Sequence, residues 1–473
     1  MTNPRTMRST RIAAVAAALM IALAPVASAQ ERETPPAPGT PRNFTLPPKH
    51  SFTLPNGLQV TLIQYGEVPK ATVELMVRAG NVAQGANEVW LANITGDYLR
   101  EGTTTRSAAQ IAEETARMGG ALFVQVQSDQ TDIGGDILGE HTPAFVRLLA
   151  DVVLNPAFPE SELPRIRATR LRSLSIARSE PQQLANEKFR EVVFGDHPYG
   201  RVFPSEAMVE GYTVEQFRQF HQQHYGAGRS HLYVAGRFDP AAVEAAIREA
   251  FAGWERGTAP SPPNATARTE RAVHLINRPA AVQSTIYLGM PVVDPSSPEY
   301  QALRVTNALL GGSFNSRITS NIREDKGYTY SPFSQLGLFP RTAFWVQTAD
   351  VTTDVTGASL REIFREIDSL RASAPPVEEL RGIQNYLAGI FVLQNSTRAG
   401  IINQLQFAEL HGLSGDYLDT VVSRVMAVTP ADVQRIARTY FDPARIVIVV
   451  VGDEQQIAEQ VAPYRTYVPQ AVR

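Results

Sequence analysis

The sequence predicts an α+β fold made of two similar halves, and three observations lead to this prediction. Segments with strand alternation and segments with helical spacing come in groups joined by hairpin signals, not in strict strand–helix–strand units. A stretch rich in Pro and polar residues lies near the middle of the chain. The parts on either side of it end in the same pattern of helix, turn and strand.

The N-terminus is expected to be a secretory signal peptide that covers residues 1–29. Three arginines precede an apolar run, and Ala27-Ser28-Ala29 forms a cleavage motif before Gln30. A membrane anchor is the alternative, but Pro25 interrupts the apolar run and small residues follow it. We therefore expect cleavage between Ala29 and Gln30, a periplasmic or secreted protein, and no membrane contact after cleavage.

Composition excludes several classes of function. The chain has 44 basic and 47 acidic residues, and removal of the signal peptide leaves 41 basic ones. This mild acidity does not suit a nucleic-acid partner. Because the chain has no cysteine, it can have no disulfide, thiolate metal site, catalytic thiol or lipid-modified cysteine.

The chain after the signal peptide is predicted to divide into four parts. Residues 30–48 are rich in Pro and polar residues and are expected to be a disordered leader. Residues 49–256 form an N-terminal lobe and residues 272–473 form a C-terminal lobe. Residues 257–271, "GTAPSPPNATARTER", read as the linker between the two lobes.

The ends of the two lobes carry the evidence for duplication. Each has a helix-capping threonine, Thr213 or Thr429, and a glycine 23 residues later, Gly236 or Gly452. An aromatic residue closes the helix at the same point in both, and a β-branched strand leads to the glycine. The agreement in register indicates a duplicated chain.

The other elements of the N-terminal lobe follow from local patterns. Asn56-Gly57 between two alternating apolar runs predicts a β-hairpin. Further strands are predicted from Thr72 and from Ala121. Helices are predicted over Leu91–Arg100, Ser107–Met118, Thr142–Val153 and Pro164–Arg178.

Five stretches, in this order along the chain, resemble the insulinase, pitrilysin and mitochondrial processing peptidase family of zinc peptidases. They are "LPNGLQV" (54–60), "REGTTTRSAAQIAEE" (100–114), "FGDHPYG" (194–200), the helix ending at Tyr225 with its strand, and "LLGGSFNSRITSNIREDKGYTYS" (309–331). The resemblance implies that each lobe consists of two related α+β subdomains. It also implies that the two lobes close like a clamshell around an extended peptide.

The zinc motif of this family is degenerate here. Family members carry His-x-x-Glu-His on a helix, because histidines at i and i+4 can share a Zn²⁺ while the glutamate takes a proton from metal-bound water. The resemblance aligns Asn93, Gly96 and Asp97 with these three positions. The family's third ligand, a glutamate, falls near Arg172 to Leu174, in a stretch with five arginines and no carboxylate. Such a helix opposes zinc binding, so no metal is expected in this chain.

The remaining histidines do not form an obvious metal site. His221 and His224 lie at i and i+3 on one predicted helix, and His231 follows a turn. No nearby carboxylate completes this set, so we expect a solvated polar face. His197 lies in the family's "GDHPYG" loop, where packing is the expected role.

The C-terminal lobe retains the family's substrate-binding pair. Family members direct an Arg and a Tyr, seven residues apart, at the substrate, and Arg323 and Tyr330 match this pattern. Gly327 is the expected end of a helix, and Tyr328-Thr329-Tyr330 the expected start of a strand, so the two side chains could converge across the turn. The alternative is a surface Arg and a core Tyr without a function.

The resemblance as a whole implies a non-catalytic, substrate-binding subunit of a heterodimeric zinc peptidase. A homologous partner with an intact motif would bring the zinc, and an unfolded peptide would be the substrate. Alone, the chain is expected to be proteolytically silent. The main alternative is a structural or binding protein of the same family with no proteolytic role. A self-sufficient peptidase with an unusual metal site is a third.

Overall fold

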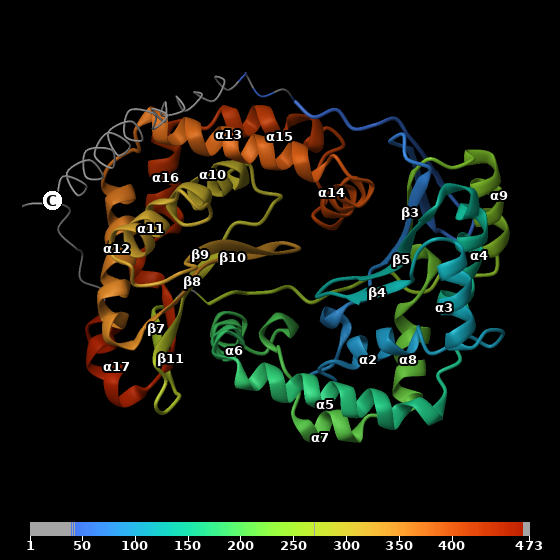
Figure 1. The fold of residues 1–473 in the computed structure, drawn as a ribbon, viewed down its shortest axis with the longest axis horizontal. Helices are drawn as coiled ribbons and strands as arrows, with labels where there is room; N and C mark the ends of the chain where they lie inside the picture. The colour runs from blue at the N-terminus through green and yellow to red at the C-terminus, as the bar shows by residue number, and fades with distance from the viewer. Residues whose placement is uncertain (1–38, 40, 42, 269, 467–473) are drawn as a thin grey trace, which may run out of the picture. The chain divides into compact units, whose positions relative to one another are not determined.

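The computed structural model describes residues 39, 41, 43–268 and 270–466, and the predicted signal peptide lies outside them. Two β-sheets with helices on their faces form the fold (Figure 1), which confirms the predicted α+β class. Among the described residues, no helix has both the length and the apolar character needed to cross a membrane.

The first sheet has six strands in the order β1-β2-β6-β3-β5-β4. Its strands are β1 (Lys49–Thr53), β2 (Gln59–Gln64), β3 (Lys70–Val77), β4 (Phe123–Val126), β5 (Thr131–Leu138) and β6 (Ser230–Gly236). The helices of this half are α2 (Leu91–Tyr98), α3 (Ala108–Arg117), α4 (Thr142–Leu154), α5 (Leu163–Ser179), α6 (Pro181–Phe194), α7 (Glu206–Gly211), α8 (Val214–His224) and α9 (Pro240–Ala250).

The second sheet has five strands in the order β7-β11-β8-β10-β9. Its strands are β7 (Ala272–Asn277), β8 (Gln283–Val292), β9 (Phe333–Phe339), β10 (Thr342–Thr352) and β11 (Val447–Gly452). The helices are α10 (Tyr300–Leu310), α11 (Arg317–Thr319), α12 (Thr356–Ala372), α13 (Val377–Gln394), α14 (Arg398–Leu410), α15 (Tyr417–Met426), α16 (Pro430–Tyr440) and α17 (Glu454–Val461), with a π-helix at Ser320–Asp325.

The two sheets share one topology. In the first sheet, the last strand, β6, pairs in parallel with β2 and antiparallel with β3. In the second sheet, the last strand, β11, pairs in parallel with β7 and antiparallel with β8. The helices before these last strands, α8 and α16, both start with a capping box, at Thr213 and Thr429. The strands end at Gly236 and Gly452, as the sequence repeat predicts. β1, which joins β2 through the predicted hairpin at Asn56-Gly57, has no counterpart in the second sheet.

Each half also covers one face of the other half's sheet. α6, from the first half, packs on β8 and β11 through residues that include the fully buried Phe189 (Figure 1). α14, from the second half, packs on β3 and β6 through Ile401 and Ile402. Each sheet has apolar side chains on both faces, so both need cover. This exchange of helices, α6 onto the second sheet and α14 onto the first, covers one face of each sheet.

The end of the predicted leader differs from the expectation of disorder. Phe44 packs edge-on against Phe391 of α13, with ring centroids 5.9 Å apart. The backbone N–H of Leu46 donates a hydrogen bond to Asp419. These two apolar side chains give a polar, Pro-rich stretch enough buried contact to be ordered there.

Candidate functional site

The degenerate zinc motif lies on α2, as predicted. Asn93 and Asp97 are one helical turn apart and face the same side of the helix. Asp97 accepts two hydrogen bonds from Arg170 of α5, at 2.6 and 2.8 Å, and Arg100 lies 3.4 Å from the same carboxylate. Arg170 also donates a hydrogen bond to the backbone carbonyl of Asn93 at 3.2 Å. A guanidinium group therefore bridges the two positions at which the family's motif has histidines.

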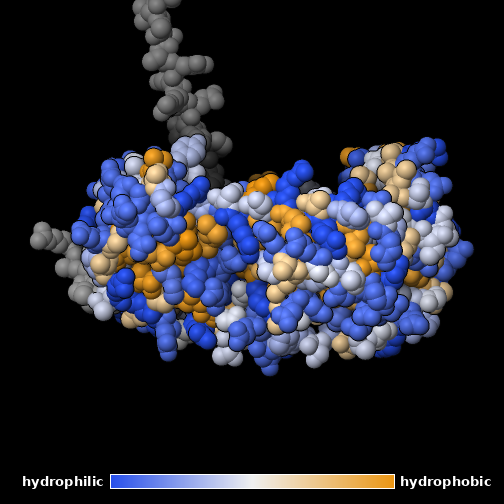
Figure 2. Space-filling model, turned by 90° about the horizontal axis from the view of Figure 1, so that it is seen from below, coloured by the Kyte–Doolittle hydropathy of each residue, from blue (hydrophilic) through white to orange (hydrophobic). Residues whose placement is uncertain are grey.

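The sequence count pointed to Arg172–Leu174 as the position facing the motif, and the structure corrects this to Arg170. Arg172 is exposed and Leu174 is fully buried. Of the residues of α5, only Ile166 and Leu174 are buried. Figure 2 shows the face of the molecule that includes α5 and α7, with hydrophilic side chains between apolar patches. The helix phase therefore turns Arg170 inward and Arg172 toward solvent.

Position 96 is closed to a larger side chain. A Cβ atom added to Gly96 would lie 2.5 Å from a methyl group of Val126 on β4. This is well inside van der Waals contact, so a glutamate at this position would force the helix or the strand to move. Gly96 is thus a close-packing position between α2 and the edge of the first sheet.

The residues present do not fit a zinc ion. Within the described part of the chain, no group of three or more His, Cys, Asp or Glu side chains could hold a metal ion. At the motif itself, the single carboxylate is already bound by a permanent cation, and a second cation there would be repelled. The charge that a metal would supply between α2 and α5 comes from Arg170 instead.

The four histidines considered as alternative ligands have ordinary packing and hydrogen-bonding roles. His221 is bonded to the backbone carbonyl of Val153, at 2.9 Å, and is not part of a solvated face as expected. His224 packs on Phe220. Elsewhere in the fold, His231 contacts Glu409 and Thr61, and His197 contacts Pro263 O and Tyr199 N.

The buried His221 gives the protein a predictable pH dependence. Burial lowers the pKa of His221 to about 4, below its ordinary value of 6.5. Because the folded state holds the neutral imidazole, protonation favours unfolding, and stability falls as the pH drops from 6.5 toward 4. Between pH 7 and pH 5, the unfolding free energy of the parent should therefore fall by about 2 kcal/mol more than that of His221→Gln.

Urea titrations at several pH values measure this difference, with His50→Gln as the control because the His50 side chain is exposed. Parallel stability curves for His221→Gln and the parent would contradict the assignment.

Arg323 and Tyr330 come together in the second half. Arg323 lies on the π-helix, and its guanidinium carbon is 4.9 Å from the centroid of the Tyr330 ring. The same carbon is 4.6 Å from the centroid of the Phe314 ring. Tyr330 is 80% exposed and Phe314 is 62% exposed, whereas the Arg323 side chain is partly buried and pairs with Glu324 at 3.1 Å. Phe314, in the "GGSFNSR" stretch, is the ring that the sequence analysis did not single out.

The local structure around this pair differs from the expected strand start. Gly327 does end the helix with φ +65°, but strand β9 begins only at Phe333. Thr329 forms an isolated bridge to Val351. Tyr330 therefore lies in the loop between this bridge and β9, where its side chain is exposed.

The degenerate zinc motif does not contact the Arg/Tyr pair. Among the described residues, no hydrogen bond, ion pair or ring contact joins Asn93, Gly96 or Asp97 to Arg323 or Tyr330. Each set belongs to its own half of the chain. An arrangement that joins a metal-activating group to the Arg/Tyr pair is therefore absent from the described part of this chain.

Both sheets end in a strand with one free edge. In the described structure β4 pairs only with β5, and β9 pairs only with β10. The two strands occupy equivalent positions in the two topologies. Unpaired backbone groups on such an edge can accept an extended peptide as an additional strand.

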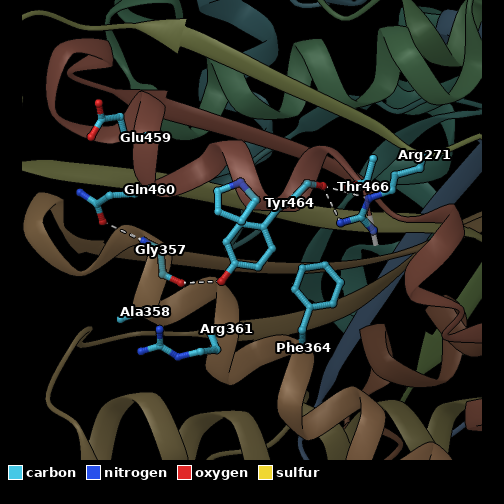
Figure 3. A pocket seen from close by; sticks show the side chains of 10 residues that line it. Arg271, Gly357, Ala358, Arg361, Phe364, Glu459, Gln460, Tyr464 and Thr466 are labelled. Atoms are coloured by element: carbon cyan, nitrogen blue, oxygen red, sulfur yellow. Dashed lines mark hydrogen bonds between the residues drawn. The ribbon is translucent and has the colours of Figure 1, made fainter. Parts of the chain in front are cut away.

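One cavity near the C-terminal end of the described chain offers no chemistry. It measures about 490 Å³ and lies beside α12 and α17 (Figure 3). The Tyr464 hydroxyl donates to the carbonyl of Gly357, and the Gln460 side chain accepts from the N–H of Gly357. These polar groups are used in holding the fold, so we assign no function to this cavity.

Comparison with known proteins identifies the family. The sequence model of the family described as insulinase (peptidase family M16) matches residues 59–203. The family model described as peptidase M16 inactive domain matches residues 211–387. The chain belongs to the insulinase family of peptidases, as the sequence motifs predicted.

Curated relatives match over most of their length. An uncharacterized zinc protease of Mycobacterium bovis is 29% identical over 403 residues, 82% of this chain and 89% of its own. The zinc protease YmxG of Bacillus subtilis is 21% identical over 392 residues, 82% of this chain and 95% of its own.

Solved structures support the fold. A peptidase M16 inactive domain from Pseudomonas fluorescens superposes with a TM-score of 0.79 at 23% identity, covering 86% of this chain and 98% of that one. A protease from Helicobacter pylori gives a TM-score of 0.80 at 16% identity, covering 86% of this chain and all of the other. At these identities the likeness concerns the fold alone.

Proposed function

We propose that this chain is the non-catalytic subunit of a periplasmic heterodimeric peptidase. A homologous partner with an intact His-x-x-Glu-His motif brings the zinc, and this chain helps to hold the unfolded peptide. One contrast between the two halves carries the proposal. Arg170 bridges the two former histidine positions, Asn93 and Asp97, in the first half. In the second half, Arg323 contacts the ring of Tyr330, which is exposed.

The chemistry of Arg323 and Tyr330 suits a role in peptide binding. A guanidinium group and a phenol hydroxyl are hydrogen-bond donors that can point at a peptide carbonyl. Donors aimed at an oxygen that becomes negative during hydrolysis contribute roughly 3 kcal/mol each to the transition state. Contacts of the guanidinium with the rings of Phe314 and Tyr330 restrict its orientation, which reduces the entropy lost on binding.

The free edges of β4 and β9 support the binding of an extended chain. Backbone hydrogen bonds to such an edge hold a peptide without regard to its sequence, which suits a substrate without a fixed structure. Export is supported by the N-terminal sequence pattern, which fits a cleaved signal peptide.

The test is a cleavage assay with purified components. The chain alone should leave an unstructured peptide intact, and cleavage should appear when it is mixed with a homologue that carries the intact motif. In the mixture, Arg323→Ala or Tyr330→Phe should lower kcat/KM at least about tenfold, which corresponds to roughly 1.4 kcal/mol.

Matched controls are Arg381→Ala and Tyr386→Phe, both on exposed positions of α13, which should leave kcat/KM unchanged. Sedimentation of the mixture separates loss of pairing from loss of catalysis. Arg323 and Tyr330 variants as active as the controls would contradict the role of this pair and would favour a structural or binding protein without a proteolytic role.

A further inference from the structure

A second cavity, whose wall contains none of the α2 motif residues and neither Arg323 nor Tyr330, is rich in positive charge. It measures about 690 Å³ and lies where the end of β3, the "GDHPYG" loop and the start of β6 meet the segment 258–263. Arg78, Arg201 and Arg229 line it. None of these three arginines forms an ion pair with a carboxylate of the residues that the structure describes.

The three arginines differ in what they already bind. Arg229 is 7% exposed and donates two hydrogen bonds to the backbone carbonyl of Arg78, so its orientation is fixed. The Nε atom of Arg78 is buried and has no hydrogen-bond partner. Arg201 lines the cavity, and its side chain forms no hydrogen bond or ion pair with the described residues. Buried donors without an acceptor are costly, which favours an anionic ligand at this point.

The other titratable groups of the wall do not neutralise this charge. Burial lowers the pKa of His197 and of His224, with neighbouring arginines adding to the effect, so both are neutral near pH 7. Asp129 is buried, and one of its oxygens accepts a hydrogen bond from the Tyr199 hydroxyl at 2.7 Å. Asp196 is exposed at the rim. The charge of Arg78 favours the ionised form of Asp129, but three arginines face two carboxylates, so the wall keeps a net positive charge.

The size and apolar parts of the wall limit the kind of anion. The cavity is within the usual range for organic ligands and far larger than a single phosphate or sulfate. Val82, Ala83 and three prolines of segment 258–263 add apolar surface beside the arginines. A ligand that fits has one planar oxyanion, which arginine can bind through two parallel hydrogen bonds, and a short apolar portion.

We propose that this cavity binds the free C-terminal carboxylate of a short peptide, with Arg78 and Arg201 as the groups that recognise it. The peptide nature of the ligand rests on the proposed function, whereas the recognition of a carboxylate rests on the cavity alone. A fragment released by cleavage has such a carboxylate, so the cavity is a site for product or for short peptide.

Equilibrium binding to the isolated full chain tests this inference without any partner subunit. The probes are an alanine tripeptide with a free C-terminal carboxylate and the same tripeptide as its C-terminal amide, both labelled at the N-terminus with an uncharged fluorophore and followed by fluorescence anisotropy at low salt. The acid should bind at least about tenfold more tightly than the amide, since hydrogen bonds to charged groups contribute roughly 1.5–3 kcal/mol.

Variants locate the site. Arg201→Met should remove the preference for the acid, and Arg201→Lys should restore part of it, because lysine keeps the charge but not the paired donors. Arg78→Met provides a second test if its thermal unfolding matches that of the parent. Arg117→Met, exposed on α3, is the control and should bind as the parent does.

Equal binding of acid and amide would overturn the inference, as would an unchanged preference in Arg201→Met. Binding of inorganic phosphate without any preference between the two peptides would also overturn it, since the site would then recognise anions in general. The cleavage assay with the partner is unaffected by these outcomes, so failure of this inference and failure of the proposed function are distinguishable.

Discussion

Phe189→Ala is expected to lower the free energy of unfolding by about 3–5 kcal/mol, the range for removal of a fully buried phenylalanine. Phe189 belongs to α6 of the first half but is completely buried against the second sheet. Its ring lies 5.3 Å from that of Phe344 on β10, and Gly289 on β8 leaves the space that the ring fills. Truncation would therefore open a cavity where α6 of the first half packs on the second sheet.

Chemical unfolding followed by circular dichroism measures this effect. Phe333→Ala, on the exposed strand β9, is the matched control and should cost much less, because Phe333 is 48% exposed. If the two variants lose similar stability, α6 does not hold the second sheet in solution, and the exchange of helices would have to be abandoned.

Rebuilding the zinc motif should fail when only the motif residues are changed. The combination of Asn93→His, Gly96→Glu and Asp97→His should bind far less than one equivalent of zinc and should unfold at a lower temperature than the parent. Arg170 then faces the new ligands without its carboxylate partner and repels a divalent cation. The new side chain at position 96 meets Val126 at a distance that packing does not permit.

Two further substitutions should relieve both obstacles. Adding Arg170→Glu supplies the third metal ligand, a carboxylate from α5, and adding Val126→Ala makes room beside α2. Metal analysis after dialysis should then find zinc bound to the five-fold variant and not to the three-fold one. Stoichiometric zinc in the three-fold variant would show that Arg170 does not exclude the metal.

Local patterns made much of the fold predictable. The capping threonines, the closing aromatic residues and the β-branched strands depend on neighbours within the same segment, so the equivalence of β6 and β11 was readable from the sequence. The hairpin at Asn56-Gly57 is of the same kind. The exchange of α6 and α14 was not readable, because an apolar helix face does not specify which of two apolar sheets it covers.

The sequence predicted which zinc ligands are missing, but it did not predict which residues lie in their place. The absence of histidines and of a carboxylate in α5 follows directly from residue types. The identity of the residue that faces Asp97 depends on the phase of α5, which the loop between α4 and α5 sets, and the count therefore missed Arg170 by two residues. Phe314 was missed because its role depends on the path of a loop rather than on spacing.

The bond between Asp97 and Arg170 also separates folding from metal supply. A zinc-held junction between two helices has to be loaded after synthesis, competes with other cations and can be stripped by a chelator. Two side chains encoded in the same polypeptide need no delivery and have no competitor in the surrounding medium. The chain should therefore mature at the same rate in metal-starved cells as in metal-replete ones.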